Sequence, residues 1–475
     1  MITIPGQIAS AKGLRVGDRM LVHRLVKAWN DHRTRNLLRH RYYTMRNELK
    51  DLGISVPPQL RNLSAACGWG KKCVDVMVEH SKFEGYTADD AEAQSVLERI
   101  GRQNRLPVLY RKATTSALEQ CFSLYFVSRG KDERVRVSAY PASACGVTWD
   151  DANDRIEAAL FVVSMSDRGY GTMKEPDWVN VVTDEYLIRI KYRDGVWHAE
   201  YMPHGLGHLP VFMAAHEPTL DRPFGTSRIT REVMGYIDSA VRANVNEEIA
   251  AAFAVSTQKY LLGTADDPFT DITKWDAYVG SVFNIDYNAD DEVMPQFGQL
   301  AQPSMEPLNV HWRILCGKMS AATGIHVSQF GQVHDNPASS DAIYAENEPL
   351  ILKVKDWNED AKMVLVDVAT AALATERHTT FDAIDQEGLG IVANMPNPAM
   401  PTLAQQTDAS VKIASVVPGF SQTRAFWTMN GFTVEETDRI LRQLEDVRTR
   451  EASNALIASI FGNEPEGVTS DGGAT

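Results

Sequence analysis

The chain has 475 residues, of which 44% are hydrophobic and 23% charged, and it carries a formal net charge of −14 at pH 7. This composition is ordinary for a folded protein with an ample core, and at this length two or more domains are expected. The acidic balance argues against a protein that binds nucleic acid with its whole surface.

No apolar run reaches the roughly 18 residues that a membrane-spanning helix needs, so we expect no membrane partner. The first residues, MITIPGQIASAKGLRV, lack the apolar core of a signal peptide.

The cysteines are odd in number and scattered without a paired spacing, which disfavours a disulfide framework or a zinc site. They are Cys67, Cys73, Cys121, Cys145 and Cys316. We therefore expect synthesis in a reducing, intracellular compartment.

The first 50 residues hold eleven Lys/Arg against three Asp/Glu. A local contact with phosphates and an amphipathic helix with a solvated basic face explain this excess equally well. Residues 14–50 read as helix, because apolar side chains recur at three- and four-residue spacing. They are Met20, Leu21, Leu25, Val26 and Trp29.

A second helix is expected over about 60–80, and a third from about 105 that gives way to CFSLYFV before 128. Short β-type runs follow, separated by Asp, Gly and Asn turns. They are VRVSAY, ALFVVSM, NVVTDEYLIRIKY and VWHAEYM. The first half is therefore predicted to be an α+β domain with antiparallel strands.

At Ser227 the pattern changes to one long helix, for which Ser227 is a suitable N-cap. Its apolar residues follow a four-residue step and form a stripe one side chain wide, which suits packing against neighbouring helices. They are Ile229, Val233, Ile237, Val241, Val245 and Ile249.

Short strands are then expected at KYLLG, SVFNIDY and MPQFGQL, joined by acidic turns. Residues 304–323 return to helix, with Ser304 as N-cap, Pro307 in the first turn and Gly324 at the C-terminus. A long polar loop, GIHVSQFGQVHDNPASSDAI, separates this helix from another that starts near Ser340 and contains Pro349, where a kink is expected.

The last part is predicted to be helical, with starts at Thr402 and Ser421 and an end at Gly431, before a disordered tail at 463–475.

Taken together, this order of elements resembles the portal (connector) proteins of tailed double-stranded-DNA bacteriophages. Local sequence segments also resemble the family: YYTMRNEL before GWGKKCVDVMVEHSKFEGY, LPVFMAAHEPTLDRPFGTSRITREVMGYIDSAV, and NPASSDAIYAENEPLILKVKDW. It spans about 35–450. QKYLLG departs from the family pattern, since many relatives have a proline before this segment.

The resemblance implies an α+β portal architecture assembled as a ring, usually a dodecamer, with these parts. They are a wing at 1–226, a first stem helix at 227–254, a clip at 255–302, a second stem helix at 303–323, a channel loop at 324–338, a kinked wing helix at 339–378 and a helical crown at 379–462.

It also implies a role at one capsid vertex of the virion, where double-stranded DNA is packaged and ejected through the ring. The implied partners are the large terminase, the head-completion adaptor, and the major capsid and scaffold proteins, after assembly in the bacterial cytoplasm. No cofactor is implied. ATP hydrolysis would belong to the terminase, because the chain has no P-loop.

Three sets of residues are the candidates for these roles. The channel loop would place small uncharged polar side chains against passing DNA: Ser328, Gln329, Gln332, His334 and Asn336. The clip would present acidic turns to terminase and adaptor: Asp266, Asp267, Asp290 and Asp291. The stem would be covered by the neighbouring subunit at Ile237, Val241, Val245 and Ile249.

Two other classes of function stay open, a non-viral oligomeric scaffold and an enzyme with an unrecognised site. His204 and His208 in HGLGH have metal-like spacing, but the two glycines favour a turn. Asp286, Asn288 and Asp290 begin like a calcium loop, yet Phe297 stands where a bidentate Glu is needed. We therefore predict no metal site and no catalytic residue.

Overall fold

The computed structural model describes residues 6–48, 66–166, 175–255, 259–262, 296–299, 304–332, 340–399, 403–432 and 434–461. The chain divides into two compact units, Met1–Pro398 and Ala399–Thr475. Among the described residues, no helix is both long and apolar enough to cross a bilayer.

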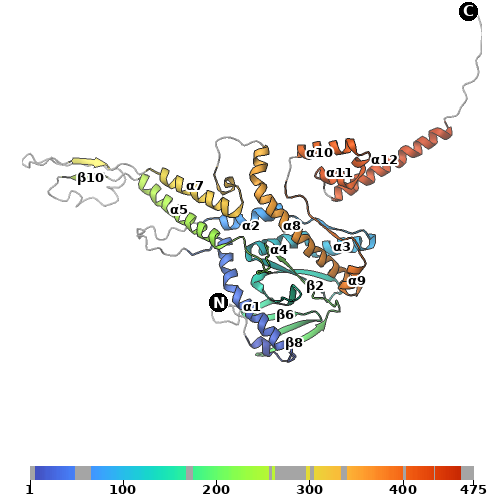
Figure 1. Cartoon of the computed structure of the whole chain (residues 1–475), viewed down its shortest axis with the longest axis horizontal. Coiled ribbons are helices and arrows are strands. Elements are labelled where there is room, and N and C mark those ends of the chain that lie inside the picture. The colour runs from blue at the N-terminus through green and yellow to red at the C-terminus, as the bar shows by residue number, and fades with distance from the viewer. Residues whose placement is uncertain are drawn as a thin grey trace, which may run out of the picture. The chain divides into compact units, whose positions relative to one another are not determined.

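The first unit mixes helices and strands (Figure 1). Its α-helices are α1 (Asp18–Tyr43), α2 (Trp69–His80), α3 (Ala91–Asn104), α4 (Leu106–Gln120), α5 (Arg231–Val255), α7 (Glu306–Thr323), α8 (Ser340–Arg377) and α9 (Phe381–Gln386). Its strands are β1 (Gly85–Thr87), β2 (Phe122–Arg129), β3 (Val135–Pro141), β4 (Cys145–Asp150), β5 (Arg155–Ser166), β6 (Glu175–Val182), β7 (Tyr186–Arg193), β8 (Val196–Pro203), β9 (Val211–Ala215), β10 (Lys259–Leu262), β11 (Gln296–Gln299) and β12 (Val392–Asn394).

The strands of the predicted wing, residues 1–226, form two antiparallel sheets, as the sequence predicts. One has five strands in the order β4-β5-β6-β7-β8, and the other has three in the order β3-β2-β9. Successive side chains of a strand point to opposite faces of its sheet, so each sheet contributes one face to one core and the other face to a second core. Phe126 of β2 stacks on Phe161 of β5 between the sheets, with ring centroids 5.4 Å apart.

Helix α1 covers the other face of the five-stranded sheet, where Leu25 and Trp29 are buried against Val179 and Ile190. Gly146 of β4 permits this close approach, because a Cβ there would lie 2.2 Å from the Leu25 carbonyl oxygen.

Two details of α1 differ from the prediction. Met20, which we predicted on the apolar side, is 68% exposed. The predicted start at 14 is also early, since residues before Asp18 form turns and a short 3-10 helix (η1, Gly6–Ser10).

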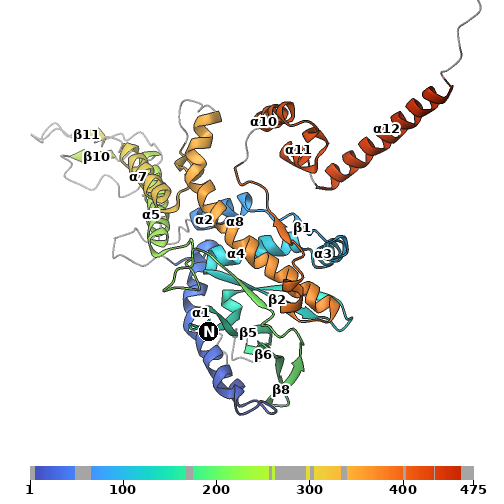
Figure 2. The same ribbon diagram turned by 45° about the vertical axis from the view of Figure 1, so that its right-hand side comes forward.

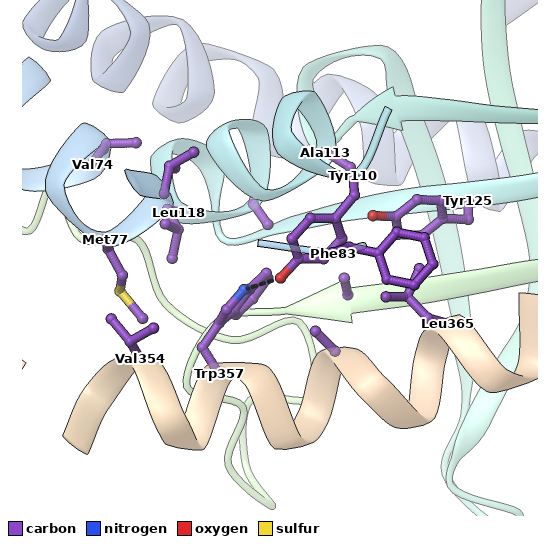
Figure 3. Packing of buried hydrophobic residues seen from close by; sticks show 14 of the residues in the cluster. Val74, Met77, Phe83, Tyr110, Ala113, Leu118, Tyr125, Val354, Trp357 and Leu365 are labelled. Atoms are coloured by element: carbon purple, nitrogen blue, oxygen red, sulfur yellow. Dashed lines mark hydrogen bonds between the residues drawn. The ribbon is translucent and has the colours of Figure 1, made fainter. Parts of the chain in front are cut away.

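The largest core joins α2, α4 and α8, and Figure 3 shows its centre. The Trp357 indole N–H of α8 donates to the Tyr110 hydroxyl of α4 over 3.0 Å. Ser81, just after α2, lies 2.6 Å from the same hydroxyl and donates to Asn358 over 2.6 Å. Buried polar groups need partners, and this network supplies them while fixing the three helices to one another.

Helices α5 and α7, the predicted stem helices, lie side by side, and the β10–β11 pair is at their far end (Figures 1 and 2). Helix α5 begins four residues later than predicted. Thr230 caps it, accepting from the Val233 N–H at 3.2 Å, while Ser227 instead donates to the Glu119 carbonyl at 2.6 Å. Helix α7 begins at Glu306, one residue later than an N-cap at Ser304 predicts, and the Ser304 hydroxyl accepts from the Glu306 N–H at 3.3 Å.

The long helix α8 contains Pro349, as predicted. After it, residues 379–398 differ from the predicted crown. They form α9 and β12 in the first unit, where Asn394 pairs with Gly85 and Ile384 is buried in the largest core. Apolar contacts and a strand pair therefore hold this segment to the wing.

The second unit is helical, as predicted. It holds α10 (Leu403–Val416), α11 (Arg424–Met429) and α12 (Val434–Phe461). Thr423, rather than Ser421, caps α11, because its hydroxyl accepts from the Phe426 N–H at 3.4 Å. Ser410 of α10 donates to the side-chain oxygen of Asn430 at 2.8 Å, which joins α10 to the end of α11.

Candidate functional site

The base of the stem is where α5 leaves the wing and α7 returns to it, and the predicted channel loop starts there. Gly324 follows α7 with φ +72°, the left-handed conformation predicted for this C-terminus. A Cβ on Gly324 would lie 3.9 Å from the Cβ of Pro349. The loop therefore starts directly beside the proline of α8.

A buried arginine holds this junction together. Arg228, only 6% exposed, donates from Nε to the Cys73 carbonyl of α2 and from Nη2 to the Thr323 carbonyl of α7, each over 2.8 Å. Burial lowers the pKa of Arg228 from its ordinary value, although a guanidinium stays charged at any physiological pH. Nothing in the sequence marks Arg228 out, because most arginines lie at the surface.

The first part of the channel loop is anchored to the core, which corrects our interpretation of it as wholly polar. Ile325 and Phe330 are buried, at 0% and 4% exposure. Phe330 packs edge-on against Trp69 of α2 with ring centroids 5.5 Å apart, and Trp69 lies 5.0 Å from Trp312 of α7. Ile325, just before the short 3-10 helix η4 (Val327–Phe330), and Phe330 at its end therefore fix the position of this helix.

This anchoring leaves the polar side chains of η4 at the surface. Ser328 and Gln329 are exposed and Gln332 is half-buried, so these three are available for contact. His334 and Asn336, the other two predicted channel residues, lie outside the described residues. The structure thus brings three of the five into one short segment of the loop.

His326 connects the loop to α8. Its Nδ1 accepts from the Ser328 N–H at 3.3 Å, and its Nε2 lies 3.5 Å from a carboxylate oxygen of Glu346. The imidazole therefore contacts the backbone of the loop and a side chain of α8 at the same time. His326 is therefore a structural link, in contrast to a freely exposed histidine.

The apolar stripe of α5 is covered differently from what we expected. Ile237 and Val241 are already buried within one chain, at 0% and 4% exposure, so a neighbouring subunit is not needed to cover them. The reason is that α2 and α7 pack on this face. Val245 and Ile249 are half-buried.

The exposed apolar residues of the stem lie on α7 instead. Val310 and Ile314 are 43% and 49% exposed, one helical turn apart, and Gly317 and Ala321 continue the same side as exposed small residues. The sequence pointed to the more regular stripe of α5 and missed this one. A single helix pair leaves this side of α7 open.

The four clip aspartates, Asp266, Asp267, Asp290 and Asp291, lie outside the described residues, as does the calcium-like stretch from Asp286. The described part of the clip is the antiparallel pair β10–β11, in which Tyr260 pairs with Gly298. This pair agrees with two of the three strands that we predicted there.

The histidines of HGLGH occupy a turn before β9, as predicted. His204 donates to the Thr183 carbonyl over 2.9 Å and accepts from the Leu206 N–H at 3.3 Å. His208 stacks on Phe381 with ring centroids 4.5 Å apart. Within the described ranges, no group of three or more His, Cys, Asp or Glu side chains is placed to hold a metal ion.

Two curated proteins are similar to this chain over most of its length. A protein named Portal protein from Mycobacterium phage D29 is 24% identical over 472 residues, covering 93% of this chain and 91% of its own. A second Portal protein, from Mycobacterium phage L5, is 23% identical over 428 residues, covering 85% of this chain and 84% of its own. The resemblance to phage portal proteins is thereby confirmed.

No family model matches the chain. Solved structures with a similar course of the chain come from gene transfer agent (GTA) particles. One is the virion of a native GTA particle, with a TM-score of 0.46, 11% identity, and coverage of 77% of this chain and 89% of that one. Another is the neck of an empty GTA particle, with a TM-score of 0.43, 12% identity, and coverage of 84% and 93%.

Proposed function

We propose that this chain, a relative of two mycobacteriophage proteins named portal protein, assembles as a ring at one capsid vertex of a tailed phage. Double-stranded DNA would enter and leave through that ring. The observation that carries the proposal is the length of the similarity, which covers 93% of this chain and 91% of the D29 protein. A match of that extent includes wing, stem and loop together.

The stem supports the assembly step. Val310 and Ile314 present an apolar strip on α7 to solvent, with the small residues Gly317 and Ala321 beyond it. Apolar side chains become more stable when a neighbouring subunit removes them from water. The half-buried Val245 and Ile249 of α5 would complete the contact in a ring of about twelve subunits.

The loop supports the conduit step. Ser328, Gln329 and Gln332 carry no charge, and each Lys or Arg that neutralises a phosphate adds salt-dependent affinity to DNA. A ring of such amides and hydroxyls can touch a moving duplex without holding it. His334 and Asn336 would extend this lining.

The clip would dock the large terminase during packaging and the head-completion adaptor afterwards, and the wing would contact capsid and scaffold proteins. Reversing Asp266, Asp267, Asp290 and Asp291 to lysine should weaken terminase or adaptor binding and leave ring formation intact, because rim charges mainly tune association. Wild-type binding by that variant would remove the clip assignment.

Negative-stain electron microscopy of the purified full-length chain, alone and with scaffold protein, tests the assembly directly. Closed rings with an axial channel are expected. Monomers alone under all conditions, with no ring in assembled particles, would contradict the proposal.

A further inference from the structure

The two sheets of the wing separate at one end and leave a cleft of about 860 Å³ between them. Its walls are β2 and β3 on one side and β6, β7 and the Pro203–Leu206 segment on the other, and the C-terminal end of α8 closes it. Figure 2 labels β2, β6 and β8 around this region.

The facing residues change from apolar to cationic along both sheets. On the three-stranded sheet, Phe126 pairs with Ser138 and, two residues further along, Ser128 pairs with Arg136. On the five-stranded sheet, Phe161 pairs with Asn180, which in turn pairs with Arg189. The interior of a two-sheet sandwich is ordinarily apolar, so arginines on both inner faces need a reason.

Among the described residues that line the cleft, every charged side chain is cationic. Its charged side chains are Arg129, Lys131, Arg136 and Arg189, joined by His204 and His378. The acidic residues that pair with them stand outside the lining. Glu133 lies 3.3 Å from Arg129, Glu200 lies 3.8 Å from Arg189 and Asp132 lies 3.4 Å from Arg136, and all three carboxylates are at least 45% exposed. This positive recess contrasts with a chain whose net charge is −14.

Two cationic side chains of β7 are not fully compensated by hydrogen bonds or opposite charges. The Nε of Arg189 is buried and has no hydrogen-bond partner among the described residues. Next to it, Lys191 stands 3.8 Å above the Trp178 ring. Burial, and after it the charges of Arg189, Arg193 and Lys131, lower the pKa of Lys191. Like charges gathered in this way would be stabilised by an anion.

We propose that this cleft binds a carboxylate-rich peptide segment of a partner protein. Arginine forks on two opposite walls match carboxylates carried by an extended chain, and the volume lies within the range of ordinary ligand sites. A DNA duplex is a wide cylinder and cannot enter such a recess. A base of single-stranded nucleic acid would need a free aromatic face, whereas Lys191 already covers the Trp178 ring.

The test is fluorescence anisotropy of the full-length chain with a short labelled peptide in which Glu and Gly alternate, at low salt. A peptide with Gln in place of Glu is the ligand control. Arg189→Gln should weaken binding about tenfold, because a charge-assisted hydrogen bond is lost from a partly buried site. Arg19→Gln removes the same charge from an exposed position near the start of α1, away from the residues that line the cleft, and should change affinity by less than about twofold.

Arg136→Gln provides a second variant from the opposite wall, and its side chain is exposed enough for the fold to tolerate the change. Thermal unfolding of each variant checks the fold. Absence of peptide binding, or wild-type affinity in both cleft variants, would overturn the proposal. Tighter binding of a short DNA duplex or of inorganic phosphate than of the peptide would also overturn it.

Discussion

Arg228, three residues before α5, donates a 2.8 Å hydrogen bond to the carbonyl of Thr323, the last residue of α7. The same guanidinium holds the Cys73 carbonyl of α2. One side chain therefore connects the end of α7, where the loop begins, to α2. This contact acts together with the buried Ile325 and Phe330 to set the position of the loop.

Arg228→Met should lower the free energy of unfolding by about 3 kcal/mol, because two buried carbonyl contacts to a charged group are lost. Urea unfolding of the full-length chain measures the loss. Arg231→Met, at an exposed position in the first turn of α5, is the matched control and should cost less than about 0.5 kcal/mol. Equal stability of the two variants would show that the Arg228 contacts contribute little.

Ile314→Asp should prevent ring closure and leave the monomer stable. The side chain is 49% exposed in one chain, so the charge stays in water until a neighbour covers it. Mass photometry of assembly mixtures reads the outcome. Asn309→Asp adds the same charge to another side of α7 and should assemble normally. Rings from Ile314→Asp would exclude this strip from the subunit contact.

Val241→Asp gives a different expectation. Because Val241 is 4% exposed within the chain, this change should destabilise the subunit itself by several kcal/mol rather than act on assembly. A folded Val241→Asp subunit of wild-type stability that fails to assemble would restore the original interpretation of the α5 stripe.

His216 gives the fold a pH dependence. It is 3% exposed, donates from Nδ1 to the Thr226 carbonyl over 2.9 Å, and its Nε2 is buried without a partner in the described part of the chain. Burial lowers the pKa of His216 from 6.5 to about 4. The contribution of His216 to the free energy of unfolding is complete above about pH 6.5 and is lost as pH falls towards 4. The reason is that, in this range, the unfolded chain binds a proton at His216 and the folded chain does not.

The expected loss across this window is about 3 kcal/mol, from about 1.4 kcal/mol for each pKa unit. His216→Asn keeps a donor near Thr226 and removes the titration, so its stability should fall less between pH 7 and pH 4.5. His23→Asn, at an exposed position of α1, should follow the wild type. Identical pH profiles for all three chains would show that folding does not shift the pKa of His216.

The periodicities of the sequence predicted the elements well. The four-residue step gave α5, the alternation gave the antiparallel wing strands, and Pro307 and Gly324 bracketed α7. These signals depend only on local geometry, which is why they could be interpreted without the fold.

What covers an apolar face is a tertiary property, and here the sequence misled us. The regular stripe of α5 is covered within the chain through Val241, while the less regular Ile314 is left open. Phe330 and Arg228 have roles that arise only when distant segments meet, against Trp69 and Thr323 respectively. A single aromatic residue in a polar loop, or an arginine before a helix, carries no periodic signal.

Gln329→Lys combined with Gln332→Lys tests the loop as the DNA-facing surface. Gln329 is exposed on η4, whose position is set by the buried Phe330, so a lysine there should not disturb the fold. Repeated around a ring, the added ammonium groups would bind phosphates and retard a sliding duplex. Packaging should slow, or genome retention should change, while empty heads form normally. Gln103→Lys places the same charge on an exposed side of α3 and should package as the wild type does. The effect should also weaken at higher salt, because released counterions drive the added affinity. Wild-type packaging rates in the double variant at low salt would place the loop away from the DNA.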